Sequence, residues 1–190
     1  MSGRLHTHTG EGWDGILMPS ETILWQGRPD PSFQFGVAQA GAAAFGLLFA
    51  GFAAVWMLLA STAGGYFWTF GLIHFSVGVG LAFGAFLYPP WRRRHTWYTL
   101  TNRRAFIATD LPMAGRKLKS WPIHGDTEIT YHDGAQATIH FANDFRQTKN
   151  GTRKIPIGFE RITEGDEVHR LMCQVRDERR AAEAMEEAAQ

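Results

Sequence analysis

One long apolar segment dominates the hydrophobic pattern of this chain. Residues 31–91 contain no Asp, Glu, Lys or Arg, and His74 is their only ionisable side chain. The segment is too long for one buried helix, but it fits two membrane spans of about 20 residues joined by a tight turn. We therefore predict a transmembrane α-helical hairpin with spans at residues 37–60 and 66–88 and a small, flexible connector at residues 61–65.

Beyond Arg94 the pattern changes to short apolar–polar alternations separated by turn residues, which is typical of antiparallel strands. The predicted strands are residues 97–101, 104–109, 117–123, 128–131, 137–141 and 154–158. A tight turn is expected at residues 101–103, and His132-Asp133-Gly134 and Asn150-Gly151 are hairpin-turn signals, the second inside a polar loop.

A helix is predicted to close the domain. Thr163 and Asp166 have the spacing of a capping box at its start. An apolar stripe at i, i+3, i+4 and i+7 then predicts packing on a sheet, and it consists of Val168, Leu171, Met172 and Val175. The stripe fades from Arg176 onward, so residues 176–190 are expected to form an exposed helical extension or a frayed tail.

Charge is distributed unevenly along the chain and predicts the topology. Residues 91–160 hold 12 Lys and Arg against 6 Asp and Glu, whereas residues 161–190 hold 5 against 8. Arg92, Arg93 and Arg94 directly follow the second span, and the connector carries no charge. The positive-inside rule then places both termini in the cytoplasm of an integral inner-membrane protein. We recognise no signal peptide, and the first span would act as an uncleaved anchor.

The basic residues next to the membrane are candidates for binding anionic lipid headgroups. They are Arg92, Arg93, Arg94, Arg103, Arg104, Arg116, Lys117 and Lys119. An ordinary solvated surface would have the same composition, so both interpretations stay open. Nucleic acid is a poor candidate partner because the charge excess is small and lies beside a membrane.

Small residues recur every four positions in both predicted spans and are candidates for helix packing. They are Ala42, Gly46, Ala50 and Ala54 in the first span and Ser76, Gly80 and Gly84 in the second. Such stripes can close the hairpin on itself, or they can mediate self-association or docking to another membrane protein.

The sequence offers little catalytic chemistry. We find no GxxxxGK[ST], Gly-x-Ser-x-Gly or His-Glu-x-x-His pattern. The lone Cys173 is expected to be a buried thiol in the closing helix, and His74 to make an interhelical hydrogen bond rather than hold a cofactor. We therefore predict a protein that is not an enzyme and has no cofactor or metal; an enzyme or cofactor-binding subunit that uses the histidines is the weaker alternative.

Three segments carry a resemblance to bacterial pleckstrin-homology-like (PH-like) membrane proteins. Residues 98–107, YTLTNRRAFI, resemble the Tyr-x-Leu-Thr-Asn-x-Arg signature of that family. Residues 21–29, ETILWQGRP, resemble its Glu-x-x-Leu-Trp-x-Gly-Arg-Pro lead-in, and residues 158–162, GFERI, resemble the segment before its closing helix. In the signature, Thr101 and Asn102 suit a tight turn, and Arg104 is placed to pair with a carboxylate or a loop carbonyl.

The resemblance implies a cytoplasmic α+β domain, an antiparallel barrel or sandwich capped by a C-terminal helix. The implied organisation is an N-terminal segment at 1–35, the hairpin at 36–91, the PH-like domain at 92–176 and a charged tail at 177–190. Some relatives with a similar lead-in are linked to assembly of photosynthetic membrane complexes. The expected function is therefore protein interaction in support of a membrane complex, with a membrane protein or a second copy as partner; the alternative is sensing of anionic phospholipid.

Overall fold

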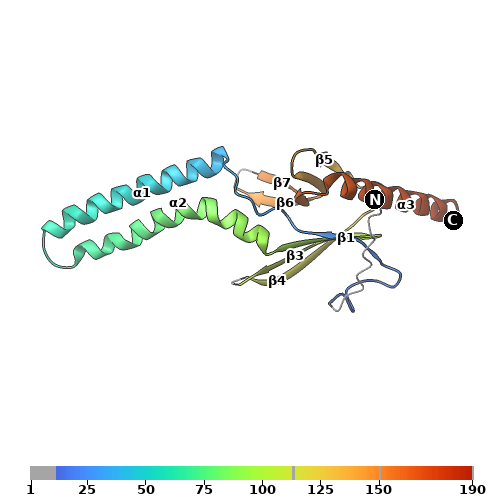
Figure 1. The fold of residues 1–190 in the computed structure, drawn as a ribbon, viewed down its shortest axis with the longest axis horizontal. Helices are drawn as coiled ribbons and strands as arrows, with labels where there is room; N and C mark the ends of the chain where they lie inside the picture. Colours follow the sequence, from blue (N-terminus) through green and yellow to red (C-terminus); the bar gives the residue numbers. More distant parts are fainter. Residues whose placement is uncertain (1–11, 113, 150, 190) are drawn as a thin grey trace. The chain divides into compact units, whose positions relative to one another are not determined.

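The computed structural model describes residues 12–189 apart from residues 113 and 150. The chain forms two compact units (Figure 1). One unit is the continuous segment Pro31–Arg93, and the other combines the residues before Pro31 with those from Arg94 onward. The second unit is therefore discontinuous in sequence.

The segment Pro31–Arg93 folds as the predicted helical hairpin. Helix α1 spans Val37–Thr62, the short helix η1 spans Phe67–Phe70, and α2 spans Gly71–Arg94. Gly64 and Gly65 in the connector have φ angles of 78° and 74°, which glycine adopts without steric cost. The two helices are long and apolar enough to cross a membrane. Most of their large side chains, such as Leu48 and Phe52, are exposed, as expected for groups that contact lipid.

The packing face of the hairpin differs from the four-residue stripes expected from the sequence. The buried positions are Ala43, Gly46, Ala50 and Ala53 in α1 and Gly71, Gly78, Ala82 and Pro90 in α2. Ala42, Ala54, Ser76 and Gly80 are exposed and Gly84 is half-buried, so of the candidates only Gly46 and Ala50 close the hairpin. The reason is geometric. Four residues turn a helix by about 400°, so a strict four-residue stripe drifts off one face, whereas alternating steps of three and four stay on it.

We expect Gly46→Ile to destabilise the hairpin far more than Gly80→Ile. A Cβ at Gly46 would lie 2.5 Å from the Ala82 amide nitrogen and 2.7 Å from the Gly78 carbonyl oxygen, whereas nothing lies within 4 Å of a Cβ at Gly80. Because the obstacle at Gly46 is backbone, the helices must separate, at a cost of at least about 1–3 kcal/mol. Thermal denaturation of the full-length protein in mild detergent measures this, and equal midpoints for the two variants would contradict the packing face.

Two antiparallel sheets and one helix form the discontinuous unit. The first sheet has the order β1-β2-β3-β4, and its strands are β1 (Ile23–Gly27), β2 (Thr96–Thr101), β3 (Arg104–Leu111) and β4 (Gly115–Pro122). The second has the order β5-β6-β7, and its strands are β5 (Thr130–His132), β6 (Ala137–Thr148) and β7 (Gly151–Ile162). Helix α3 (Gly165–Ala188) follows β7.

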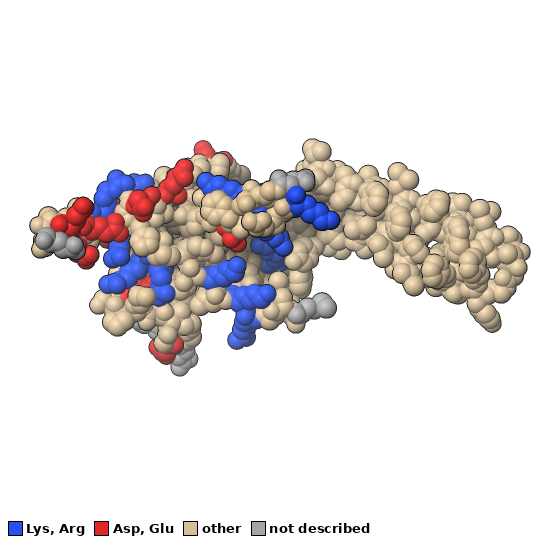
Figure 2. All heavy atoms as spheres, turned by 180° about the vertical axis from the view of Figure 1, so that it is seen from behind, with Lys and Arg blue, Asp and Glu red and all other residues tan. Residues whose placement is uncertain are grey.

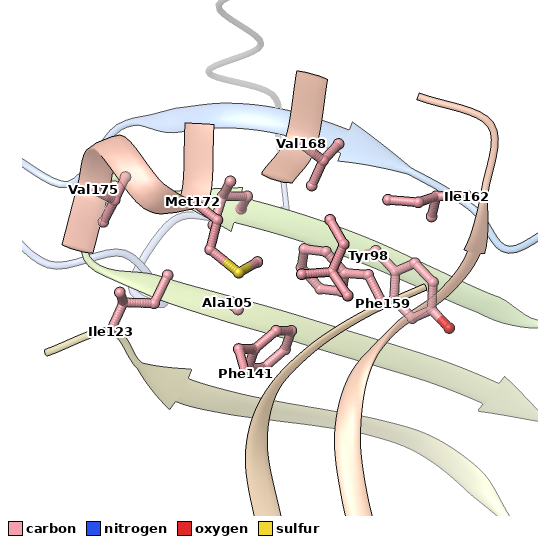
Figure 3. Packing of buried hydrophobic residues seen from close by; sticks show 11 residues of the cluster. Tyr98, Ala105, Ile123, Phe141, Phe159, Ile162, Val168, Met172 and Val175 are labelled. Atoms are coloured by element: carbon pink, nitrogen blue, oxygen red, sulfur yellow. The ribbon is translucent and has the colours of Figure 1, made fainter. Parts of the chain in front are cut away.

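The hydrophobic core lies between the two sheets and under α3 (Figure 3). Tyr98 of β2 stacks on Phe159 of β7 at 4.8 Å between ring centroids, and Phe141 of β6 meets Phe159 edge-on at 5.1 Å. The stripe predicted for the closing helix is confirmed, because Val168, Met172 and Val175 are fully buried and Leu171 packs at the margin of the core.

The start of α3 differs from the expected one, whereas its last turns form the expected helical extension, with residues 181–189 exposed. No side chain caps its N-terminus, so the predicted capping box is wrong. The carboxylate of Asp166 instead accepts a hydrogen bond of 2.6 Å from the Tyr131 hydroxyl. The region beyond Arg176 is helical and in part docked: the Arg180 guanidinium donates to the Gly125 carbonyl at 2.7 and 2.9 Å, and the Gly125 amide donates to Glu183.

Candidate functional site

The segment before the helical hairpin contains a strand of the discontinuous unit. Sequence patterns assigned residues 1–35 to a separate N-terminal segment, but Ile23–Gly27 within it is β1 and pairs antiparallel with β2. Gln26 lies opposite Thr99 and Gly27 opposite Tyr98. The hairpin is thus inserted between two neighbouring strands of one sheet. The five-residue strand was missed because half-buried apolar residues next to a long apolar segment show no alternation of their own.

A buried ion pair fixes the start of β1. The carboxylate of Glu21 is 7% exposed and accepts a bidentate pair of hydrogen bonds from Arg104, at 2.6 Å from Nη2 and 3.1 Å from Nε. The Thr101 hydroxyl donates to the same carboxylate at 2.7 Å, and the Met18 amide donates at 2.9 Å. Arg104 also donates to the Ile16 carbonyl at 3.1 Å. The carboxylate partner expected for Arg104 is therefore Glu21 of the lead-in.

The ionisation of Glu21 follows from this environment. Burial alone raises the pKa of a carboxyl group, because the charged form loses solvation. Here the hydrogen bonds from Arg104, the Met18 amide and Thr101, together with the charge of Arg104, outweigh burial and hold the Glu21 pKa below its ordinary value of 4.5. The guanidinium of Arg104 has a pKa raised by its hydrogen bond to Glu21. The pair is therefore ionised at neutral pH.

The Thr-Asn turn after β2 also joins β1 to the sheet. As predicted, Thr101 bonds to nearby backbone: its hydroxyl accepts hydrogen bonds from the Arg103 and Arg104 amides at 3.2 and 2.9 Å. Asn102 reaches farther along the chain, because its side-chain oxygen accepts from the Thr22 amide at 3.0 Å and its amide group donates to the Ser20 carbonyl at 3.1 Å. The signature is therefore hydrogen-bonded to the lead-in, which lies about 80 residues earlier in the sequence.

The middle and the end of the lead-in contact the third motif and the helix it precedes. The indole of Trp25 lies 5.6 Å from the Phe159 ring and donates a 2.6 Å hydrogen bond to Glu164. The Asp30 amide donates to the Arg161 carbonyl at 2.8 Å, and the carboxylate of Asp30 accepts a hydrogen bond from Gln136 and lies 3.9 Å from the Arg161 guanidinium. All three motifs therefore meet along β1.

The eight basic candidates do not form one surface. Arg103 lies in the turn between β2 and β3, and Arg104 follows it as the first residue of β3. This turn is at the end of the first sheet where Arg104 is the register partner of Pro122. Arg116 is paired with Asp110 at the opposite end, six positions or about 20 Å along β3. Arg104 is moreover committed to Glu21, so it is no headgroup ligand. Arg116, Lys117 and Lys119 are exposed on β4.

Of the three arginines at the end of α2, Arg93 has hydrogen-bond partners at the start of the hairpin segment. Arg93 donates to the Ser32 carbonyl at 3.2 Å and to the Gln34 side chain at 3.0 Å. Because these partners precede α1, Arg93 ties the end of α2 to the entry of the hairpin. Arg92 and Arg94 are exposed at the end of α2.

A second basic group extends the one on β4 and was missed in the sequence. The polar loop expected at residues 142–153 is mostly strand, and it carries the exposed residues Arg146, Lys149 and Arg153 with Phe145, which is 66% exposed. Lys154, the next residue on β7, is exposed as well. Lys119 and Trp121 of β4 line one shallow pocket together with Asn143 and Asp144 of β6, so β4 and the β6–β7 hairpin are neighbours. We call the residues of these two groups the basic end of the domain. Figure 2 shows where Lys and Arg side chains lie on one face of the protein.

The residues weighed for chemistry do not gather into a metal-binding cluster in the described part of the chain. Among the described residues, no group of three or more His, Cys, Asp and Glu side chains is placed to hold a metal ion. His74 lies between aromatic rings, 5.5 Å from Phe70 and 6.1 Å from Phe49. His132 and His140 meet edge to face, and the pKa of His140 is lowered by burial and by His132. Cys173 is half-buried, and its sulfur lies 3.5 Å from His169.

Comparisons of the chain with protein-family models, with curated proteins and with solved structures gave no match.

Proposed function

We propose that this chain is an integral inner-membrane protein whose cytoplasmic PH-like domain is a protein-interaction module that supports the assembly or stability of a membrane complex. The observation that carries the proposal is the insertion of the hairpin between β1 and β2. A domain joined to a membrane segment through two neighbouring strands stays at that membrane, where its effective concentration for partners in the same bilayer is high. Such an arrangement suits a module that presents one surface to a partner in the same membrane.

The strand order supports the PH-like part of this proposal. A four-stranded antiparallel meander, a three-stranded antiparallel meander and a closing C-terminal helix follow one another. The three motifs of the resemblance also form one contact network around β1. Since fold alone does not determine function, the interaction role needs its own test.

In-cell photo-crosslinking of the tagged full-length protein tests the interaction role. A photoreactive residue replaces Lys119 at the basic end in one variant and Glu186 in α3 in a matched variant. We expect at least one of these surfaces to crosslink repeatedly to subunits of one defined membrane complex. Recovery of the protein alone, at matched abundance and from both positions, would overturn the proposal.

The basic end favours a second candidate function, the sensing of anionic phospholipid. Arg116, Lys117 and Lys119 are exposed on β4, as are Arg153 and Lys154 on β7, and each basic residue close to an anionic surface contributes about 1 kcal/mol of attraction. Hydrogen exchange of the full-length protein in nanodiscs tests this function. Slower exchange of β4 and of the β6–β7 hairpin in phosphatidylglycerol than in phosphatidylcholine would support it, and equal exchange would eliminate it.

A further inference from the structure

The outer face of the first sheet carries a groove of about 780 Å³ that lies wholly within the soluble unit. Trp97, Ala108 and Leu118 are register partners on β2, β3 and β4, so their side chains share one face. This face is opposite to the core, because the adjacent residue Tyr98 points into the core. These three residues form the apolar floor of the groove.

The described part of the N-terminal segment, from Gly12 onward, covers one part of this outer face. Trp13 packs edge-on against Phe106 at 5.2 Å, and the Arg104 guanidinium lies 4.8 Å from the same ring, so Phe106 is only 2% exposed. Among the described residues the cover extends no farther than Phe106, and Trp13 and Ile16 form one wall of the groove. Leu118 remains 43% exposed in it. The described residues therefore leave this apolar floor uncovered next to the closed contact of Trp13 with Phe106.

The rim of the groove is basic. The Arg28 guanidinium lies 4.7 Å from the centre of the Trp97 ring, where cation–π attraction fixes its position. Arg116 and Lys117 line the same groove, and Asp110 is its only described acidic lining residue, paired with Arg116 at 3.0 Å. The rim therefore keeps a net positive charge above an apolar floor, which complements a molecule with an anionic head and a hydrocarbon chain.

The groove lies at the end of the sheet that connects to the membrane hairpin. Arg28 precedes Pro31 by three residues, and Trp97 follows Arg94 by three residues. An extended chain spans about 3.3–3.6 Å per residue, so the rim lies within roughly 11 Å of both points where the chain leaves the soluble unit. A lipid of the bilayer that receives the hairpin is therefore the amphiphile with the shortest path to this site.

We propose that this groove binds one anionic phospholipid of the surrounding bilayer, with its phosphate at Arg28 and Arg116 and an acyl chain along Trp97, Ala108 and Leu118. The proposal rests on the membrane location in the proposed function, and it goes beyond charge attraction at the basic end by naming a site for a single lipid. Arg146, Lys149, Arg153 and Lys154 take no part in it, since they do not line the groove.

Native mass spectrometry of the full-length protein, released from mild detergent after addition of phosphatidylglycerol or phosphatidylcholine, tests the proposal. We expect one phosphatidylglycerol to be retained in preference to phosphatidylcholine. Leu118→Glu and Arg28→Glu should each lower that retained fraction at least tenfold. Lys119→Glu is the matched control on the strand position next to Leu118, because Lys119 does not line the groove, and it should retain the lipid as the wild type does.

Equal retention by the wild type and both groove variants, with unchanged circular dichroism, would overturn the groove site. A loss of retention on Arg153→Glu and Lys154→Glu but not on the groove variants would also overturn it, and it would leave lipid sensing at the basic end intact. If one groove variant fails to fold, lipid retention by the other variant tests the site, because Leu118 is on β4 and Arg28 follows β1. Failure of the interaction role would appear separately, in the crosslinking experiment.

Discussion

A chain in which a short Gly-Ser linker replaces residues 31–93 is expected to fold cooperatively in water, whereas residues 95–190 alone are not. The linker version keeps β1 opposite β2, with Gly27 across from Tyr98. The fragment 95–190 loses this strand, the Trp25 contact with Phe159 and the carboxylate partner of Arg104. Removing one partner of a buried ion pair alone costs about 3–5 kcal/mol, which is a large part of the 5–15 kcal/mol that stabilises a typical domain.

Chemical denaturation followed by tryptophan fluorescence and circular dichroism measures this difference. The matched control is the linker version with Trp25→Ala and Glu21→Ala, which has the same length as the linker version but lacks two of the contacts of β1. We expect it to approach the behaviour of the fragment. A sigmoidal transition of residues 95–190 at the same midpoint as the linker version would show that β1 is not part of the domain.

Arg104→Met is expected to destabilise the soluble unit by about 3–5 kcal/mol, because it leaves the Glu21 carboxylate buried without its cation. The double variant Glu21→Gln with Arg104→Met should recover part of this loss, since no buried charge remains. Arg116→Met is the matched control: its side chain is 88% exposed and its partner Asp110 is also on the surface, so the cost should stay below about 1 kcal/mol. Equal losses for the two arginine variants would contradict the role of the pair.

The pH dependence of stability should change sign between the wild type and Arg104→Met. In the wild type the Glu21 pKa is lowered by folding, so its contribution is present above the unfolded value of 4.5 and is lost as the pH falls through the folded pKa. Without Arg104 burial dominates and raises this pKa, so the variant should lose stability as the pH rises above 4.5. Urea midpoints between pH 3 and pH 7 measure both slopes, and parallel curves would exclude Glu21 as the source.

Most elements were predictable where a local pattern specifies them. The charge-free segment predicts both spans, and the stripe of Val168, Met172 and Val175 predicts α3. β1 was not predictable in this way, because its pairing with β2 joins residues separated by the whole hairpin. The capping box failed because Asp166 bonds to Tyr131, a tertiary contact that the spacing with Thr163 does not reveal.

The candidate residues were likewise predictable where a local preference determines their role, and not where a contact with a distant residue does. The conformational preferences of Thr101 and Asn102 predicted a turn, and the structure contains it. Composition did not reveal that Arg104 forms an ion pair with Glu21, because the two residues meet only in the folded chain. It also did not reveal that Arg146 and Lys154 lie on long strands, because the pairing of β6 with β7 determines those strands. The four-residue spacing of Gly80 and Gly84 placed them on the wrong face, since helix packing follows angular position rather than residue identity.

Disulfide crosslinking of β1 to β2 in the intact protein tests most directly that the hairpin is inserted within one sheet. Gln26 and Thr99 are register partners whose side chains hydrogen-bond at 3.2 Å, so cysteines at both positions are expected to join on mild oxidation of membranes, in a Cys173→Ser background. Cysteines at Gln26 and Arg153 serve as the unpaired control. Efficient linkage of only the Gln26–Thr99 pair, detected by peptide mass spectrometry, is the result this account predicts. No linkage of that pair, with both thiols open to maleimide, would contradict it.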